Sequence, residues 1–86
     1  MGNIVEFKSN AANYWKEKYD LKNNTLREND AFDPRFRLLR DFKIGLVDCL
    51  IIRIRLGNAK HEFFERVVRD VTFYKGWYVV TWNPIY

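Results

Sequence analysis

The chain is poor in cysteine, because Cys49 is the only one among its 86 residues. A single thiol excludes a disulfide within the chain, a cysteine-based zinc site and a CxxC redox pair. Cys49 lies in the apolar run 46–52, and free cysteine is among the most buried residue types. We therefore expect a buried structural thiol.

Serine and histidine are equally scarce, with Ser9 and His61 as the only examples. A Ser-His-Asp triad cannot be built convincingly, because Ser9 occupies an expected helix N-cap and His61 follows a turn-forming segment. Acidic pairs such as Glu62 with Glu65 lack the spacing of metal ligands. We expect no metal, no cofactor, and a surface position for His61.

Long apolar runs are also missing. No run approaches the roughly 20 residues of a membrane-spanning helix, and residues 1–9 are too short and too polar for a signal peptide. These features predict a cytoplasmic protein without a membrane partner. We expect one domain over residues 1–86, whose net charge of +4 permits a polyanionic partner without requiring one.

Aromatic residues, in contrast, are abundant, and they define the end of the chain. Two aromatic and β-branched runs flank Tyr74-Lys75-Gly76 and predict a hairpin that pairs 63–73 with 77–82, with an irregularity at Val67-Val68. Asp33 before Pro34 is typical of a helix start. The expected strands are 4–7, 25–28, 47–56, 63–73 and 77–82, and the expected helices are 10–20 and 34–40. This order predicts an α+β domain with two short helices and a small, strongly twisted, mostly antiparallel sheet or partial barrel.

Arginines gather on two of these expected strands. Arg53 and Arg55 share one face of their strand, because successive strand residues point to opposite faces, and Arg66 and Arg69 follow on the next strand. Guanidinium groups suit phosphate, and aromatic side chains interleaved with them can stack on bases. Arg53 and Arg55 are therefore candidates for nucleic-acid binding, with three aromatic residues nearby in the sequence: Tyr74, Trp77 and Tyr78.

The alternative interpretation of these arginines is structural. Opposite charges on neighbouring strands stabilise a sheet and keep its outer face soluble. The acidic residues available for such pairing are Asp48, Glu65 and Asp70.

A second candidate site is Lys22-Asn-Asn-Thr25-Leu-Arg27, which follows the first expected helix and leads into a strand. The order strand, helix, K-x-x-T-x-R, an F-x-x-G turn over 42–45 and three strands that end in Gly76-Trp-Tyr-Val-Val80 resembles the ASCH family. That resemblance implies a PUA-like fold. It also implies that Lys22, Thr25 and Arg27 line a cleft for a nucleobase or a nucleic acid, with RNA favoured.

Some ASCH proteins that this chain resembles are acetylcytidine amidohydrolases, which use a lysine, a threonine and a glutamate. Lys22 and Thr25 match the first two, but the glutamate would fall near 68–69, where Glu65 and Asp70 are out of place. The family's glycine before the lysine is Leu21 here. We therefore expect no carboxylate within hydrogen-bond reach of Lys22. Because hydrolysis needs a carboxylate to handle protons, we expect a binding module rather than an enzyme.

Three functions remain open. The first is a module that binds RNA or a nucleotide-like ligand near the K-x-x-T-x-R segment. The second is a protein-interaction module of phage type that docks on a host protein, favoured by an exposed apolar patch around any of three tryptophans: Trp15, Trp77 and Trp82. The third is a divergent amidohydrolase in which Glu65 or Asp70 replaces the missing glutamate.

Overall fold

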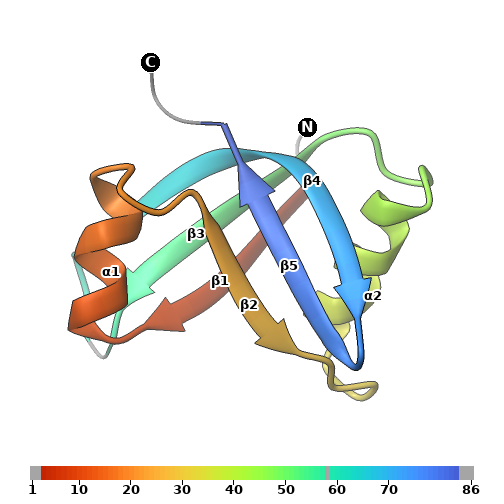
Figure 1. Cartoon of the computed structure of the whole chain (residues 1–86), viewed down its shortest axis with the longest axis horizontal. Coiled ribbons are helices and arrows are strands. Elements are labelled where there is room, and N and C mark those ends of the chain that lie inside the picture. The colour runs from red at the N-terminus through yellow and green to blue at the C-terminus, as the bar shows by residue number, and fades with distance from the viewer. Residues whose placement is uncertain (1–2, 58, 84–86) are drawn as a thin grey trace.

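A computed structural model describes residues 3–57 and 59–83 as one curled sheet flanked by two helices (Figure 1). In chain order the elements are β1 (Asn3–Ser9), α1 (Ala11–Lys18), β2 (Asn24–Glu28), α2 (Pro34–Lys43), β3 (Leu50–Leu56), β4 (Phe63–Tyr74) and β5 (Trp77–Trp82). All seven expected elements are therefore present, and the predicted α+β class is confirmed.

The sheet has the strand order β1-β3-β4-β5-β2. Only β1 and β3 pair in parallel; the other three pairings are antiparallel. The long strand β4 bends around the molecule and changes partner along its length, which curls the sheet into a half-barrel (Figure 1). This leaves β1 and β2 as the two edge strands, one on each side of the opening.

The hairpin between β4 and β5 is shorter than predicted. Residues 68–74 pair with β5, whereas 63–67 pair with β3. The register shifts between Val68 and Asp70, next to the expected irregularity, and a bulge at this point lets one strand serve two partners at different angles. Lys75 and Gly76 both have positive φ, 50° and 85°, as a two-residue type I′ turn requires.

The core fills the concave side of the half-barrel. The alternation predicted for β3 holds, since Leu50, Ile52 and Ile54 are fully buried while Arg53 and Arg55 lie on the other face. From β5, Val80 and Trp82 enter the same core. The helices add further core side chains, namely Tyr14, Phe36 and Leu39.

The N-cap residues of the two helices can be compared with those predicted from the sequence. Asn10, not Ser9, caps α1, because its side-chain oxygen accepts from Asn13 N at 2.9 Å. The helix α2 begins as predicted, with Asp33 as N-cap and Pro34 in its first turn. It continues through Lys43, so the expected turn over 42–45 is half helical.

The third strand starts later than the apolar run suggests. Residues 47–49 precede β3, so Cys49 is exposed and the prediction of a buried thiol is wrong. The apolar run extends beyond the strand into the connecting segment, where no neighbouring element covers the Cys49 side chain. No helix in the described part of the chain is long and apolar enough to cross a membrane.

Candidate functional site

The two edge strands of the half-barrel are joined by one side chain, Arg27 of β2. Its guanidinium donates to two β1 groups: the Lys8 carbonyl oxygen at 2.8 Å and Ser9 Oγ at 3.0 Å. Its Nε donates to Thr25 Oγ1 at 3.0 Å, and its Cζ lies 4.9 Å from the centre of the Phe7 ring. Arg27 therefore spans the open side of the sheet, where β1 and β2 do not pair.

The surroundings of Arg27 shift the pKa of its guanidinium group. Burial lowers the pKa of Arg27, and the negative charge of Glu17 acts in the opposite direction. The positive charge of Arg35 adds to the lowering. Even so, an arginine keeps its proton. A half-buried positive charge therefore lies on the open side of the sheet between β1 and β2, which we call the seam.

Glu17 of α1 is the most unusual residue of this region, because its carboxylate is fully buried. Ser9 Oγ donates to its Oε1 at 2.9 Å. The other oxygen, Oε2, accepts no hydrogen bond and lies 3.5 Å from Lys22 Nζ. Buried charges are normally both paired and hydrogen-bonded, so Oε2 keeps an unused acceptor capacity.

We expected no carboxylate within hydrogen-bond reach of Lys22; the Glu17 carboxylate nevertheless forms an ion pair with it at 3.5 Å, without a hydrogen bond. The chain reverses directly after α1, where Asp20 adopts a left-handed conformation with φ of 63°. Leu21 N and Lys22 N then both donate to the Lys16 carbonyl oxygen, at 2.9 and 3.1 Å. This tight turn brings Lys22 back beside the last turns of the helix, and hence beside Glu17.

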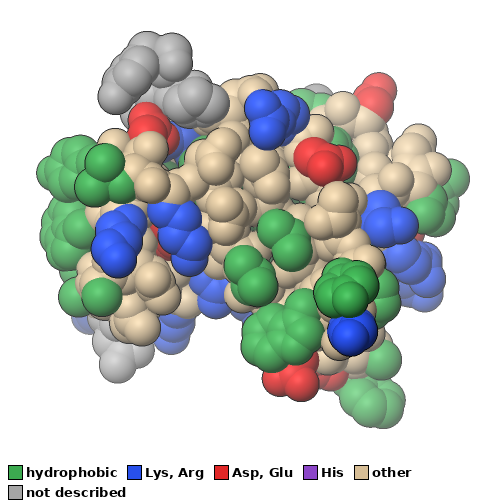
Figure 2. All heavy atoms as spheres, in the orientation of Figure 1, with side chains coloured by type: hydrophobic (Ala, Val, Ile, Leu, Met, Phe, Trp, Pro, Cys, Tyr) green, Lys and Arg blue, Asp and Glu red, His purple; other side chains and the backbone are tan. Residues whose placement is uncertain are grey.

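These side chains surround a hollow of about 270 Å³, which we call the polar hollow. Its main polar groups are Ser9, Glu17, Lys22, Thr25 and Arg27, with Asn10 and Asn13 at its border. Lys22, Thr25 and Arg27, the three residues singled out in the sequence, thus lie around one space. Figure 2 shows basic side chains over α1 and between α1 and β2 on this face of the molecule.

Glu17 and Ser9 were not recognised in the sequence as site residues. Glu17 lies three positions after the buried Tyr14, so both point from the same side of α1. The signal in the sequence that could have identified Glu17 was a glutamate on the apolar side of a short helix. The carboxylates considered instead are elsewhere: Glu65 is exposed on β4 and accepts from Arg53 Nε at 2.7 Å, and Asp70 is exposed beyond the bulge.

Arg53 and Arg55 lie on the convex face of the sheet, away from the polar hollow. Glu6, Arg53 and Glu65 are aligned across three strands, and Arg53 contacts both carboxylates. Arg55 donates to Glu6 Oε2 at 3.1 Å and to the Lys60 carbonyl oxygen at 2.8 Å. These contacts correspond to the structural interpretation of the arginines, in which they pair with carboxylates on neighbouring strands. Glu6 is a partner that the sequence did not suggest.

The other two arginines do not complete a patch with Arg53 and Arg55. Arg66 turns toward α1, where its Nη2 donates to the Lys18 carbonyl oxygen at 2.8 Å and its Nε lies 3.8 Å from Asp20. Arg69 is exposed at the bulge of β4. A single basic face of four arginines is therefore not formed.

The aromatic residues named in the sequence divide between the two faces. Tyr78 and Trp82 are buried, whereas Trp77 and Tyr74 face outward and border an apolar hollow with Leu26. Trp15 is partly exposed on α1. Figure 2 shows two separate groups of hydrophobic side chains on this face, one at α1 and one over β2 and β5.

His61 is exposed, as expected. Within residues 3–57 and 59–83, no group of three or more His, Cys, Asp or Glu side chains has a metal-binding arrangement. The chain matches none of the protein-family models against which it was compared, and no curated protein sequence is significantly similar to it.

Proposed function

We propose that this protein is an ASCH-like, PUA-like module that binds a nucleobase of RNA, or a nucleoside-like ligand, in the polar hollow. The observation that carries the proposal is the Glu17 carboxylate. It is fully buried at the hollow, and its Oε2 has a cation at 3.5 Å but no hydrogen-bond donor. A ligand that brings a donor to Oε2 would supply the missing bond.

The chemistry of the hollow fits the edge of a base. Glu17 accepts, and the ammonium group of Lys22 donates, so the site offers both functions within 3.5 Å. Cytosine presents an exocyclic amino donor next to acceptors, and carboxylates accept hydrogen bonds from that amino group. The volume of about 270 Å³ lies just below the roughly 300–1,000 Å³ of drug-sized sites, which favours a single base or nucleoside.

Arg27 contributes to the site mainly through contacts within the protein. Both of its Nη atoms and its Nε already donate within the protein. It therefore holds β1 and β2 at the distance that shapes the hollow, and it adds positive potential for a polyanionic ligand. Lys22, less tightly held, is the side chain that reaches the ligand in this proposal.

The test is calorimetric titration of the parent protein with cytidine and with uridine at low salt. We expect cytidine to bind more tightly, because uracil offers a carbonyl oxygen where cytosine has its amino group. Glu17→Gln and Lys22→Met are each expected to weaken cytidine binding about tenfold or more, since a bond to a charged group contributes roughly 1.5–3 kcal/mol. Lys16→Met, a matched change at an exposed α1 lysine, is expected to leave it unchanged.

Two results would count against the proposal. One is the absence of binding of any nucleoside or short RNA by the parent protein. The other is binding that Lys22→Met and Lys16→Met affect equally, which would show that general charge and not the hollow attracts the ligand.

One further observation favours the amidohydrolase as a second candidate. Glu17, Lys22 and Thr25 border the same hollow, so a glutamate from α1 stands beside the lysine and threonine that the ASCH resemblance implies. In this arrangement Glu17 would take and return protons for Lys22, and the Thr25 hydroxyl, which accepts from Arg27 Nε, keeps its own proton to donate.

This second candidate predicts release of acetate from N4-acetylcytidine, measured by chromatography of the nucleoside. Glu17→Gln should abolish turnover, because the amide cannot exchange a proton in the same way. Cytidine binding without turnover would eliminate the hydrolase and leave the binding module intact.

A further inference from the structure

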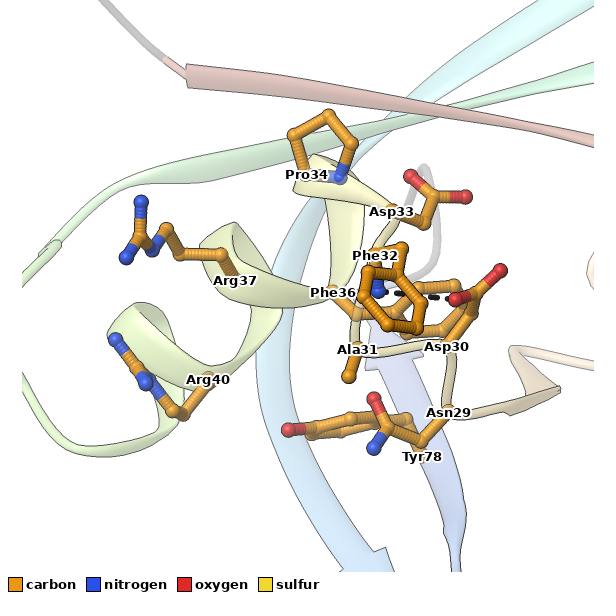
Figure 3. A pocket seen from close by; sticks show the side chains of 10 residues that line it. All are labelled: Asn29, Asp30, Ala31, Phe32, Asp33, Pro34, Phe36, Arg37, Arg40 and Tyr78. Carbon is orange, nitrogen blue, oxygen red and sulfur yellow. Dashed lines mark hydrogen bonds between the residues drawn. The ribbon is translucent and has the colours of Figure 1, made fainter.

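A second and larger hollow opens between the β2–α2 loop, the first turns of α2 and β5 (Figure 3). Its volume is about 550 Å³, roughly twice that of the polar hollow. We call it the aromatic hollow, because its characteristic side chains are Phe32, Phe36 and Tyr78 together with two arginines, Arg37 and Arg40.

The aromatic side of the hollow is built into the core. Phe36 and Tyr78 are buried, and their ring centres lie 5.8 Å apart at an angle of 33°. Phe7 packs on Phe36 from one side, and Phe73 packs on Tyr78 from the other. Since both rings are fixed by neighbours, they form a rigid apolar floor of the hollow.

Phe32 stands at the lip of the hollow and is 97% exposed. Its backbone N–H donates to Asp30 Oδ1 at 3.0 Å, so the loop that carries it is held in place (Figure 3). A fully exposed phenylalanine contributes nothing to the hydrophobic core. Beside a fixed aromatic surface, its ring is available to cover a ligand that stacks there.

The opposite side of the hollow is basic. Arg37 and Arg40 are three residues apart on α2 and therefore lie on the same side of the helix. Arg40 pairs with Asp41 at 3.1 Å, whereas the exposed Arg37 has no acceptor within the described ranges 3–57 and 59–83. The acidic residues at the border, Asp30 and Asp33, lie on the far side from these arginines in Figure 3.

The aromatic hollow connects with the polar hollow along the seam between β1 and β2. A third hollow of about 520 Å³ lies between them. It shares Lys8 and Arg27 with the polar hollow and shares Asp30, Asp33 and Phe36 with the aromatic hollow. The polar hollow thus extends along β2 as far as Arg27, and the aromatic hollow begins directly after the strand, at Asn29.

We infer that the aromatic hollow binds a second nucleotide of the same single-stranded RNA, with its base stacked on Phe32 over the floor formed by Phe36 and Tyr78 and its phosphate on Arg37. Aromatic faces stack on bases, and guanidinium groups bind phosphate through paired N–H donors. The inference rests on the proposed function, because it assumes that the ligand of the polar hollow belongs to a nucleic-acid strand.

The experiment measures fluorescence anisotropy of a short, labelled single-stranded RNA against salt concentration, with cytidine calorimetry on the same proteins. Phe32→Ala should weaken RNA binding about 5- to 100-fold, as loss of one stacked base predicts. Arg37→Ala should reduce the slope of log affinity against log salt by roughly one. Both variants should bind cytidine as the parent does, since neither residue borders the polar hollow.

Two matched controls separate the hollow from general surface effects. Tyr74→Ala removes another exposed aromatic ring, and Arg69→Ala removes another exposed arginine. Neither should change RNA affinity or salt slope in the way that Phe32→Ala and Arg37→Ala do. Because Phe32 lies outside the core, its alanine variant should also keep the thermal midpoint of the parent.

The possible failures are distinguishable. If the parent binds cytidine and RNA but Phe32→Ala and Arg37→Ala match their controls, the second site is wrong and the proposed function stands. If the parent binds cytidine but no RNA, the inference also fails. Displacement of the RNA by a polyglutamate peptide at equal charge would assign the hollow to an acidic protein partner instead. No binding of either ligand would overturn the inference and the proposed function together.

Discussion

The concave and convex faces of this sheet use arginine in opposite ways. On the concave side, Arg27 donates to a carbonyl oxygen and two hydroxyl oxygens, all of them neutral acceptors. On the convex side, Arg53 contacts the carboxylates of Glu6 and Glu65. The pKa of Arg27 is lowered by burial, whereas the pKa of Arg53 is raised, chiefly by its hydrogen bond to Glu65.

This difference separates a face whose charges are paired with each other from a face that keeps a partly unpaired positive charge, and the proposed binding site lies on the second. The convex charges neutralise each other in solvent, where each ion pair contributes little to stability and attracts few ligands. The positive charge of Arg27 is balanced only indirectly, through Ser9 and Glu17, so part of its field reaches the seam. Counting arginines along the strands does not reveal this difference, because it depends on which acceptors the folded sheet brings to each guanidinium group.

The largest expected effect tests Arg27 against Arg53. Arg27→Met keeps the apolar stem but removes three hydrogen bonds, so we expect the free energy of unfolding to fall by about 2–4 kcal/mol. Arg53→Met removes only exposed ion pairs and should have a much smaller effect. Urea denaturation measures both losses, provided that the free energy of unfolding depends on urea concentration with the same slope in all the proteins. Equal losses would show that the two faces contribute alike and that Arg27 does not join the edge strands.

The next comparison uses two valines that are adjacent on β5. Val80 is fully buried, and Val79 faces the outer side beside Leu26. Val80→Ala should cost about 1–3 kcal/mol through lost burial and a cavity, and Val79→Ala less than about 0.5 kcal/mol. Chemical denaturation of the two variants measures both losses. A small effect at Val80 would contradict the assignment of the concave face to the core.

The smallest effect concerns acid pH on the convex face. The hydrogen bond from Arg55 lowers the pKa of Glu6 below its ordinary value of 4.5. The unfolded chain therefore binds more protons just below that pH, so this contribution to stability is present above about pH 5 and is lost as pH falls. We expect Glu6→Gln to be slightly less stable than the parent at neutral pH, with the difference shrinking as the pH falls below 4.5.

Thermal midpoints measured from pH 7 down to pH 3 provide the check, with Glu28→Gln as control. Glu28 is exposed on β2 and has no cationic partner in the described part of the chain. Its variant should follow the parent curve throughout. A constant offset between Glu6→Gln and the parent at every pH would show that the effect is not electrostatic.

Local patterns were sufficient to predict the elements and their faces. The alternation of Leu50, Ile52 and Ile54 with Arg53 and Arg55 gave the buried face of β3, because side-chain direction in a strand depends only on residue parity. Lys75-Gly76 determined the hairpin turn in the same way, since a type I′ turn needs positive φ at both central positions.

Partners across space were not predictable by the same means. The sequence contains no sign that β4 divides between β3 and β5, or that Glu6 meets Arg53 and Arg55, because those pairings depend on strand order and register in the folded sheet. Cys49 became exposed for a related reason: apolar character indicates burial only where another element arrives to cover it.

The polar hollow shows the same division. The sequence by itself singled out Lys22, Thr25 and Arg27 as neighbours along one short segment. Only the tertiary structure added Glu17, by turning the chain back on itself at Asp20, and Ser9, by bringing the other edge of the sheet within reach of Arg27. Spacing along a chain limits which residues share a face, but contacts between distant segments form only when burial of the core closes the sheet around them.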